Sequence, residues 1–191
     1  AFEKFLNEFP TSPYAEKVSS YLVEVYMNTR SYDAALKSID RIAKPSAQIL
    51  EAKQKILFQL GTQSFANADF EQALKYLNQS IAIGQYNRQT KADAYYWCGE
   101  SYYRLNRMVE AARDFNAYLQ LTTQPNNEMY ALANYNLGYI AFHRKDYTQA
   151  SNYFQKYVQL EKGENATALA DAYNRIGDCH LHVRNFEEAK Q

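Results

Sequence analysis

Three residues of types that bind metals stand close together near the end of the chain: Cys179, His180 and His182. On an α-helix, residues three or four apart share a face, whereas adjacent residues diverge by about 100°. Cys179 and His182 could therefore converge on one ion, but His180 would point elsewhere. Two ligands fall short of the four protein ligands, or three plus a water, that zinc normally takes. We expect a buried cysteine between ordinary helix residues, with no metal ion and no cofactor.

Other residues that could carry chemistry do not form a catalytic motif. The sequence contains no HExxH pair, no glycine-rich phosphate loop and no G-x-S-x-G elbow. Four of the six glycines also recur at a fixed spacing, which leaves few for a phosphate cradle. The sequence therefore predicts a protein that is not an enzyme.

Charge and hydropathy argue against two classes of partner. The 21 basic and 21 acidic residues give a net charge of zero, whereas nucleic-acid binders usually carry a basic patch or stripe. No run approaches the ~18 consecutive apolar residues of a membrane-spanning helix. The 18 tyrosines and 10 phenylalanines rank below alanine, leucine and lysine in helix propensity, so they must serve packing or binding.

A fixed spacing of glycine and alanine organises the chain. A glycine precedes an alanine by 12 residues four times, and Val23 precedes Ala35 by the same step. Successive units advance by 38 or 39 residues. Small residues let two antiparallel helices approach at about 8–10 Å, so the spacing predicts a series of helical hairpins. The four pairs are Gly61 and Ala73, Gly99 and Ala111, Gly138 and Ala150, and Gly177 and Ala189.

The third unit resembles the tetratricopeptide repeat (TPR) signature W-x2-L-G-x2-Y…A-x3-F…P, in which two antiparallel helices form one stackable unit. The resemblance implies an all-α fold, a right-handed TPR superhelix of antiparallel helix pairs. The step of 38–39 residues exceeds the TPR period of about 34 by roughly one helical turn. The matching residues are Tyr95-x2-Cys98-Gly99-x2-Tyr102, then Ala111-x3-Phe115, then Pro125.

We predict one solenoid over residues 1–191 that is a fragment of a longer chain. Its parts are the end of a preceding repeat at 1–13, repeats at 14–46, 47–88, 89–126 and 127–164, and a truncated repeat at 165–191. The expected helices cover about 1–9, 14–28, 32–43, 47–66, 69–83, 89–105, 108–121, 127–144, 147–161 and 166–183, and Phe186 opens one more. Each unit departs somewhere from the signature: Ser19, Leu57 and Asn134 replace its first aromatic residue, and Ser64, Ala141 and His180 replace its tyrosine. Cys98 and Cys179 fall two units apart, so we expect no disulfide between them.

The resemblance also implies a binding face. In TPR proteins the first helix of each unit lines the concave surface, and ligands touch residues six and three before the glycine and one, four and five after it. These offsets share one helical stripe. Here the middle of the groove would be aromatic and its C-terminal end acidic. The candidate partner-binding residues are Phe58, Phe65, Tyr96, Glu100, Tyr103, Arg104, Tyr135, Tyr139, Phe142, His143, Asn174 and Asp178.

Two interpretations of the aromatic stripe stay open. Exposed aromatic clusters usually mark an interaction surface, since tyrosine offers a large contact area at low entropic cost. Alternatively, the long helices bury these rings between adjacent units. Solvent exposure of the rings separates the two interpretations, and Trp97 fits either.

One known TPR function does not fit. TPR domains that bind chaperone C-termini clamp a carboxylate with lysine and asparagine. The corresponding positions lack that clamp, and Glu100 would repel a carboxylate. They hold Ser20, Glu24, Phe58, Thr62, Tyr96 and Glu100.

The sequence predicts a non-catalytic protein–protein interaction scaffold that binds a peptide or partner protein in an aromatic concave groove. The rivals are a structural spacer segment of a larger multi-repeat envelope protein and a carbohydrate- or enzyme-associated module. We expect a protein or peptide ligand, no nucleic acid and no membrane insertion of this segment.

The N-terminal segment Phe5–Ala15, FLNEFPTSPYA, looks like the F-L-x-x-[YF]-P-x-S-x-Y-A junction of bacterial envelope TPR proteins. That group includes outer-membrane-assembly lipoproteins and periplasmic partners of the Tol–Pal system. The resemblance implies a periplasmic or outer-membrane-associated location, with the cytoplasm as the rival. A purely mechanical interpretation is that Phe5 and Phe9 pack the helix end, Pro10 stops it and Ser12 caps the next helix.

Overall fold

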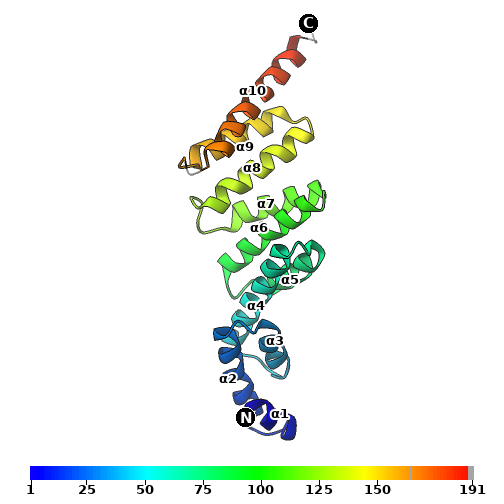
Figure 1. Cartoon of the computed structure of the whole chain (residues 1–191), viewed down its shortest axis with the longest axis vertical. Helices are drawn as coiled ribbons and strands as arrows, with labels where there is room; N and C mark the ends of the chain where they lie inside the picture. The colour runs from blue at the N-terminus through cyan, green and yellow to red at the C-terminus, as the bar shows by residue number, and fades with distance from the viewer. Residues whose placement is uncertain (164, 189–191) are drawn as a thin grey trace.

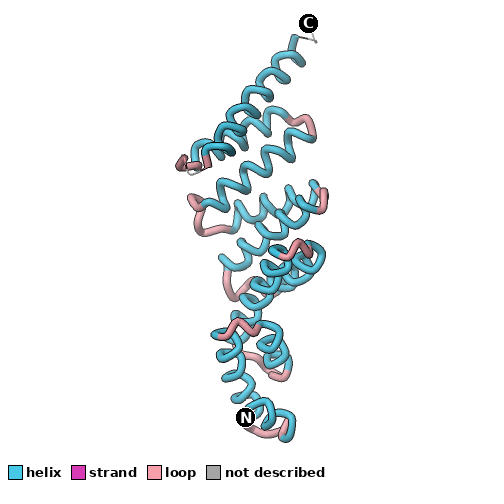
Figure 2. The backbone as a smooth tube through the Cα atoms, viewed as in Figure 1, coloured by secondary structure: helices cyan, strands magenta, loops and turns pink. Residues whose placement is uncertain are grey.

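The chain is a column of antiparallel helices. The computed structural model describes residues 1–163 and 165–188, with only the backbone described for 185–188. Within these ranges there are ten helices and no strand (Figures 1 and 2). The predicted all-α solenoid is confirmed. The helices are α1 (Phe2–Glu8), α2 (Ala15–Asn28), α3 (Tyr32–Asp40), α4 (Ala47–Ala66), α5 (Phe70–Ala82), α6 (Arg88–Arg104), α7 (Met108–Leu121), α8 (Glu128–His143), α9 (Tyr147–Leu160) and α10 (Ala166–Glu188).

Four helix pairs form hairpins: α2 with α3, α4 with α5, α6 with α7 and α8 with α9. Helix α1 packs on α2 at one end of the column, and α10 packs on α9 at the other. Figure 1 shows the N- and C-termini at opposite ends of this column. Within the described residues, the main contacts of each hairpin are with its neighbours in sequence, which is the defining property of a solenoid.

The hairpin turns are Schellman motifs, in which the residue after the C-cap adopts a left-handed backbone. In the third unit, Asn106 has a φ of 59°. Its N–H donates to the carbonyl of Tyr103 at 3.0 Å, and the N–H of Arg107 donates to the carbonyl of Tyr102 at 2.8 Å. The equivalent residues of the other hairpins also have positive φ and are not glycine either: Arg30, Ala68 and Lys145.

Three of the four hairpin interiors, those of α4–α5, α6–α7 and α8–α9, are built around a glycine that faces a large side chain sixteen residues later. The alanine anchors are fully buried, so small residues do permit close helix packing as predicted. The glycine, however, makes room for the larger side chain rather than for the alanine. The facing pairs are Gly61 with Leu77, Gly99 with Phe115 and Gly138 with Phe154, and the buried alanines are Ala35, Ala73, Ala111 and Ala150.

The last repeat departs from the prediction. Helix α10 continues from Ala166 to Glu188, so a helix end near Val183 and a new helix at Phe186 are wrong. Gly177 was expected to be buried in a hairpin but is exposed, and no described atom beyond its own helix backbone and chain neighbours lies within 4 Å of its Cβ position. In the hairpins α4–α5, α6–α7 and α8–α9, by contrast, the second helix packs against the glycine of the first. The expected anchor Ala189 lies outside the described residues.

The N-terminal junction differs in detail from the mechanical interpretation. Phe5 and Phe9 do contact each other, with ring centroids 5.6 Å apart, but Phe9 is 55% exposed. The N-cap of α2 is Tyr14, whose side chain makes no capping hydrogen bond. Ser12 instead accepts a hydrogen bond from the N–H of Tyr14 at 3.2 Å.

Candidate binding surface

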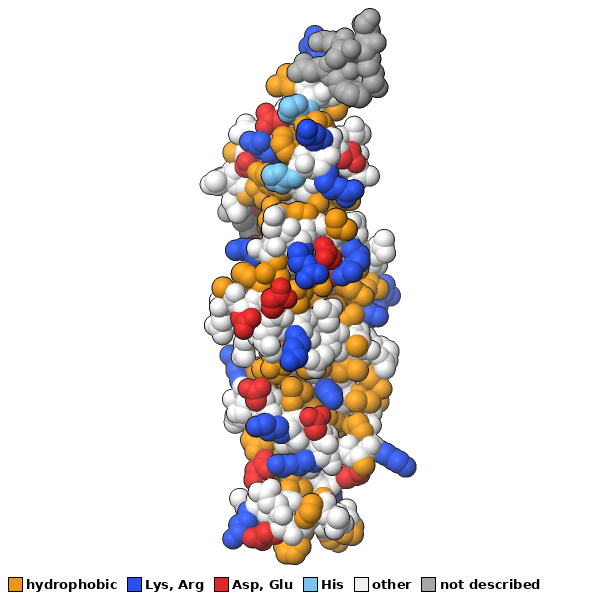
Figure 3. Space-filling model, turned by 90° about the vertical axis from the view of Figure 1, so that its right-hand side faces the viewer, with side chains coloured by type: hydrophobic (Ala, Val, Ile, Leu, Met, Phe, Trp, Pro, Cys, Tyr) orange, Lys and Arg blue, Asp and Glu red, His pale blue; other side chains and the backbone are white. Residues whose placement is uncertain are grey.

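The candidate residues lie on the first helix of each unit, namely α4, α6, α8 and α10. Figure 3 shows one face of the column, where basic and acidic side chains alternate among hydrophobic ones without a large field of one sign. The contacts of each helix decide which candidates remain available to a partner. They divide the candidates into buried, internally bonded and exposed groups.

Tyr96 belongs to the core and not to an open groove. It is 4% exposed, and its ring packs against the rings of Phe115 and Tyr118 at centroid distances of 5.7 and 5.4 Å. Burial raises the pKa of Tyr96 far above its usual range, so its hydroxyl stays protonated. The expectation that this ring faces a ligand is wrong, because the ring fills the space between α6 and α7.

Glu100 is tied to the next unit. Its Oε1 accepts hydrogen bonds from the hydroxyl of Tyr96 at 3.3 Å and from the side-chain amide of Asn136 on α8. Burial raises the pKa of the Glu100 carboxyl, and these two hydrogen bonds partly oppose the rise. Glu100 therefore links α6 to α8. Its carboxyl group is correspondingly less available to pair with a binding partner.

Asp171 joins two candidate tyrosines to the last helix. The hydroxyl of Tyr135 donates to Oδ2 of Asp171 at 2.8 Å, and the hydroxyl of Tyr139 donates to the same oxygen. The pKa values of both tyrosines are raised, first by burial and then by these hydrogen bonds. Arg175 pairs with Asp178 at 2.8 Å and lies beside Asp171 at 3.7 Å. This network fastens α10 to α8.

Two contacts between units share an offset that the groove offsets did not include. In each, the residue two positions before a glycine anchor packs on the aromatic residue four positions after the preceding anchor, whereas Asn136 at this offset bonds to Glu100. The indole of Trp97 lies 4.9 Å from the ring of Phe65, and the guanidinium of Arg175 lies 5.6 Å from the ring of Phe142. Trp97, which fitted either interpretation, is thus an inter-unit contact. The sequence signal that could have predicted these contacts is the recurrence of large or polar residues two positions before each glycine.

All candidates except Tyr96 keep some accessible surface, including those bonded inside the chain. Arg104, His143 and Asn174 are exposed. The other side chains are half-buried, and the guanidinium of Arg104 lies 5.9 Å from the ring centroid of Phe65. The half-buried set is Phe58, Phe65, Glu100, Tyr103, Tyr135, Tyr139, Phe142 and Asp178. The structure therefore divides the aromatic stripe between packing and exposure.

A cavity of about 450 Å³ lies between α2 and α4. Its walls combine apolar side chains with polar groups, among which Glu24 is the titratable one. The predicted partner-binding residues did not include this cavity. Ser20 and Glu24 were noted only as groove positions that do not carry the lysine and asparagine of a carboxylate clamp. The lining residues are Ser20, Val23, Glu24, Met27, Asn28, Ser46, Gln48, Ile49 and Ala52.

The histidine and cysteine cluster at the end of the chain is dispersed. Cys179 is buried, and burial raises the pKa of its thiol. Nε2 of His180 lies 3.3 Å from Oγ of Ser151, and the ring of His182 stacks on Tyr147 at 4.3 Å. In the described ranges, no three His, Cys, Asp or Glu side chains are grouped to hold a metal ion. Cys98 and Cys179 are free thiols, and no described helix is long and apolar enough to cross a membrane.

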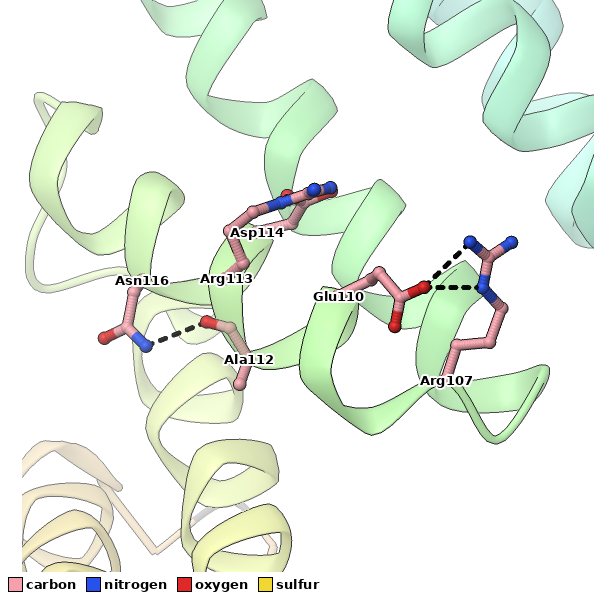
Figure 4. Close-up of polar contacts among 6 residues, drawn as sticks. All are labelled: Arg107, Glu110, Ala112, Arg113, Asp114 and Asn116. Carbon is pink, nitrogen blue, oxygen red and sulfur yellow. Dashed lines mark hydrogen bonds and ion pairs between the residues drawn. The ribbon is translucent and has the colours of Figure 1, made fainter.

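The sequence did not predict a group of polar contacts at the N-cap and in the first half of α7. Arg107 donates two hydrogen bonds to Glu110, and Arg113 pairs with Asp114 at 2.7 Å (Figure 4). Asp114 is only 1% exposed, and its Oδ2 has no hydrogen-bond partner in the described chain. Burial raises the pKa of this carboxyl despite the ion pair with Arg113.

Solved structures with the same fold include the MamA protein, at 17% identity and a TM-score of 0.56, covering 93% of this chain and 91% of that one. BtubC (BKLC) from P. vanneervenii is 13% identical, with a TM-score of 0.59 and coverage of 99% and 82%. YrrB, a TPR protein with an unusual peptide-binding site, is 16% identical, with a TM-score of 0.58 and coverage of 99% and 87%. At these identities the likeness concerns the fold alone. No curated protein matched the sequence.

Family models described as tetratricopeptide repeat match residues 58–128 and 131–163. Together the matched segments span more than half of the chain. They cover the C-terminal part of α4, all of α5, α6, α7 and α9, and almost all of α8, and the glycine anchors and Schellman turns of these hairpins repeat in phase. The chain therefore belongs to the tetratricopeptide repeat family.

Proposed function

We propose that this chain is a non-catalytic scaffold that binds a peptide segment of a partner protein along the first helices of its repeats. One observation carries the proposal. Apart from Val23, the α2 residues lining the 450 Å³ cavity are Ser20, Glu24, Met27 and Asn28. They stand three before and one, four and five after Val23, which are the TPR ligand offsets.

The cavity has the chemistry expected of a peptide site. Met27, Ile49 and Ala52 offer apolar surface, while Glu24, Asn28 and Gln48 supply polar groups that can pair with a peptide backbone or side chain. Methionine adapts its shape to different ligands. The peptide-binding site named for the TPR protein YrrB agrees with a ligand of this class.

The candidate residues are revised accordingly. We propose that Phe65, Tyr103, Arg104, Phe142, His143 and Asn174 extend the surface beyond the cavity, because their side chains are exposed or half-buried. Tyr96 supports the fold from within. Glu100, Tyr135 and Tyr139 hold adjacent units in position, since their polar groups are bonded to the next unit. Asp178 pairs with Arg175 on its own helix.

The test is selection of peptides from a random display library on the intact chain, followed by affinity measurement on variants. We expect Met27→Ala with Glu24→Gln to weaken the selected peptides by tenfold or more, since a few buried contacts dominate binding (about 1.4 kcal/mol per tenfold). Val109→Ala is the matched control, because Val109 is 72% exposed on the second helix of its unit. Equal weakening by the control, or none by the cavity variant, would move the binding surface elsewhere.

A second candidate is a structural spacer segment of a larger envelope protein. The hydrogen bonds of Tyr135 and Tyr139 to Asp171 favour it, because they join neighbouring units, and Tyr96 is buried within its own hairpin. A spacer predicts that the library selection yields no peptide whose binding depends on first-helix residues.

We also propose a periplasmic or outer-membrane-associated location, based on the Phe5–Ala15 junction. Fractionation of cells that make the full-length parent tests this proposal. Recovery wholly in the cytosol would favour the cytoplasmic alternative.

A further inference from the structure

A second cavity, of about 360 Å³, lies at the N-terminal junction and away from the first-helix surface. Leu6 and Ser19 are its buried members, at 5% and 1% exposure. Asn7, Pro10 and Arg41 are exposed residues around it, and Ala15 is half-buried. The cavity thus has a small buried floor and a rim open to solvent.

Ser19 is an unusual residue for this floor. It stands four positions before Val23, where the third unit carries Tyr95 four positions before Gly99. Tyr95 packs against the large central core cluster. Replacing such a ring by a serine removes most of a large aromatic side chain, and Ser19 lines the cavity.

The hydroxyl of Ser19 has no hydrogen-bond partner among the described residues. The neighbouring Ser20, by contrast, donates its hydroxyl to the carbonyl of Glu16 at 3.0 Å. A buried polar group without a partner costs free energy, and a ligand that supplies the partner recovers it. The floor of the cavity therefore combines space for a ring with one hydroxyl, that of Ser19, that can still form a hydrogen bond.

The rim adds features that suit an aromatic guest. Phe9 and Tyr14, which adjoin Pro10 and Ala15 in sequence, are 55% and 67% exposed. Exposed rings next in sequence to lining residues offer a partner additional contact area. The guanidinium of Arg41, held by Glu3 at 2.7 Å, also lines the cavity and can lie over an aromatic face.

We infer that this cavity is an anchor site for a tyrosine side chain of a partner peptide, independent of the first-helix surface. The ring would replace the aromatic residue missing at position 19 and contact Leu6 and Ala15. Its hydroxyl would pair with Ser19. The hydrogen bond makes tyrosine a better guest than phenylalanine, because a site built to bond a hydroxyl discriminates against an analogue that lacks it.

The test uses N-acetyl-tyrosinamide as the probe, with N-acetyl-phenylalaninamide and N-acetyl-leucinamide as comparators. Amide NMR shifts of Leu6, Ala15 and Ser19 in the intact chain report binding. We expect saturable shifts at these positions with the tyrosine probe, and roughly fivefold weaker binding of the phenylalanine probe, as one lost hydrogen bond predicts.

Two variants of Ser19 separate space from hydrogen bonding. Ser19→Tyr should fill the cavity, abolish probe binding and raise Tm. Ser19→Ala should keep phenylalanine binding and reduce the preference for tyrosine to about one. Ser20→Ala is the matched control, because its hydroxyl is already bonded along α2, and it should leave both affinities unchanged.

Three results would overturn the inference. The first is an absence of shifts at the cavity residues up to the solubility of the probe. The second is equal binding by the parent and by Ser19→Tyr. The third is failure of Ser19→Tyr to fold, since a cavity of the inferred shape accepts that ring.

Discussion

A methyl group on Gly99 would lie 2.8 Å from Cδ1 of Phe115, closer than carbon atoms approach in folded proteins. The ring of Phe115 is fully buried and rests on the bare backbone of α6. Gly138 and Phe154 stand in the same relationship in the next unit. Glycine is required here by a close approach and not by an unusual backbone angle.

The first prediction concerns this contact. We expect Gly99→Ala to lower the free energy of unfolding by roughly 1–3 kcal/mol, because the ring must shift within a packed interior. Gly177→Ala is the control: among the described residues, no atom beyond its own helix backbone and chain neighbours lies within 4 Å of its Cβ position, so the substitution should stabilise α10 by roughly 0.5–1 kcal/mol. Urea denaturation of both variants measures the difference. Effects of the same sign would show that the glycine–ring contact is not a constraint.

The second prediction concerns the left-handed turn at Ala68, where φ is 60°. Because this conformation costs an L-residue roughly 1–2 kcal/mol, we expect Ala68→Gly to stabilise the chain by up to about 1 kcal/mol. Ala117→Gly, within α7, should destabilise it by about 0.5–1 kcal/mol instead. Thermal unfolding followed by circular dichroism tests the pair. A lower Tm for Ala68→Gly would contradict the proposed strain.

The third prediction concerns the link between α8 and α10. Asp171→Ala removes the acceptor shared by Tyr135 and Tyr139, whose hydroxyls then lose their partner. We expect a cost of roughly 1–3 kcal/mol and faster amide exchange in α10 than in α6. Asn174→Ala, at an exposed position of the same helix, should leave exchange unchanged. Equal exchange rates in the two variants would mean that Asp171 does not hold α10.

The fourth prediction concerns pH and the buried Asp114. Its pKa is raised in the folded chain, so the native state binds more protons than the unfolded state as this group titrates. Its contribution to stability is therefore greatest at acid pH and falls as pH rises from the unfolded value, about 3.9, through the raised folded value. Asp114→Asn should lose this part of the pH dependence. The difference in stability between variant and parent should therefore shift in favour of the variant between pH 4 and pH 7.

Chemical denaturation at several pH values measures this effect. The control is Asp33→Asn, at an exposed position in the first turn of α3. The difference between parent and variant isolates Asp114 from the other carboxyls. An unchanged pH profile for Asp114→Asn would show that this carboxyl titrates alike in both states.

The sequence by itself determined the hairpins. Gly99 and Ala111 recur in phase with their counterparts, and a glycine and an alanine twelve residues apart specify where two antiparallel helices touch. Such contacts form within about forty residues of chain, so local spacing encodes them. The helix bounds of α4 and α7 follow from the same pattern and its turn residues.

Only the tertiary structure decided which residues on the predicted binding stripe are free. Tyr96 and Tyr103 both occupy ligand offsets, yet Tyr96 fills the core and Tyr103 stays half-exposed. An offset fixes the face of a helix on which a side chain lies. Whether the next unit covers that face depends on how successive hairpins are rotated and spaced. That rotation arises from packing such as Trp97 on Phe65 and Asn136 on Glu100, between residues more than thirty positions apart.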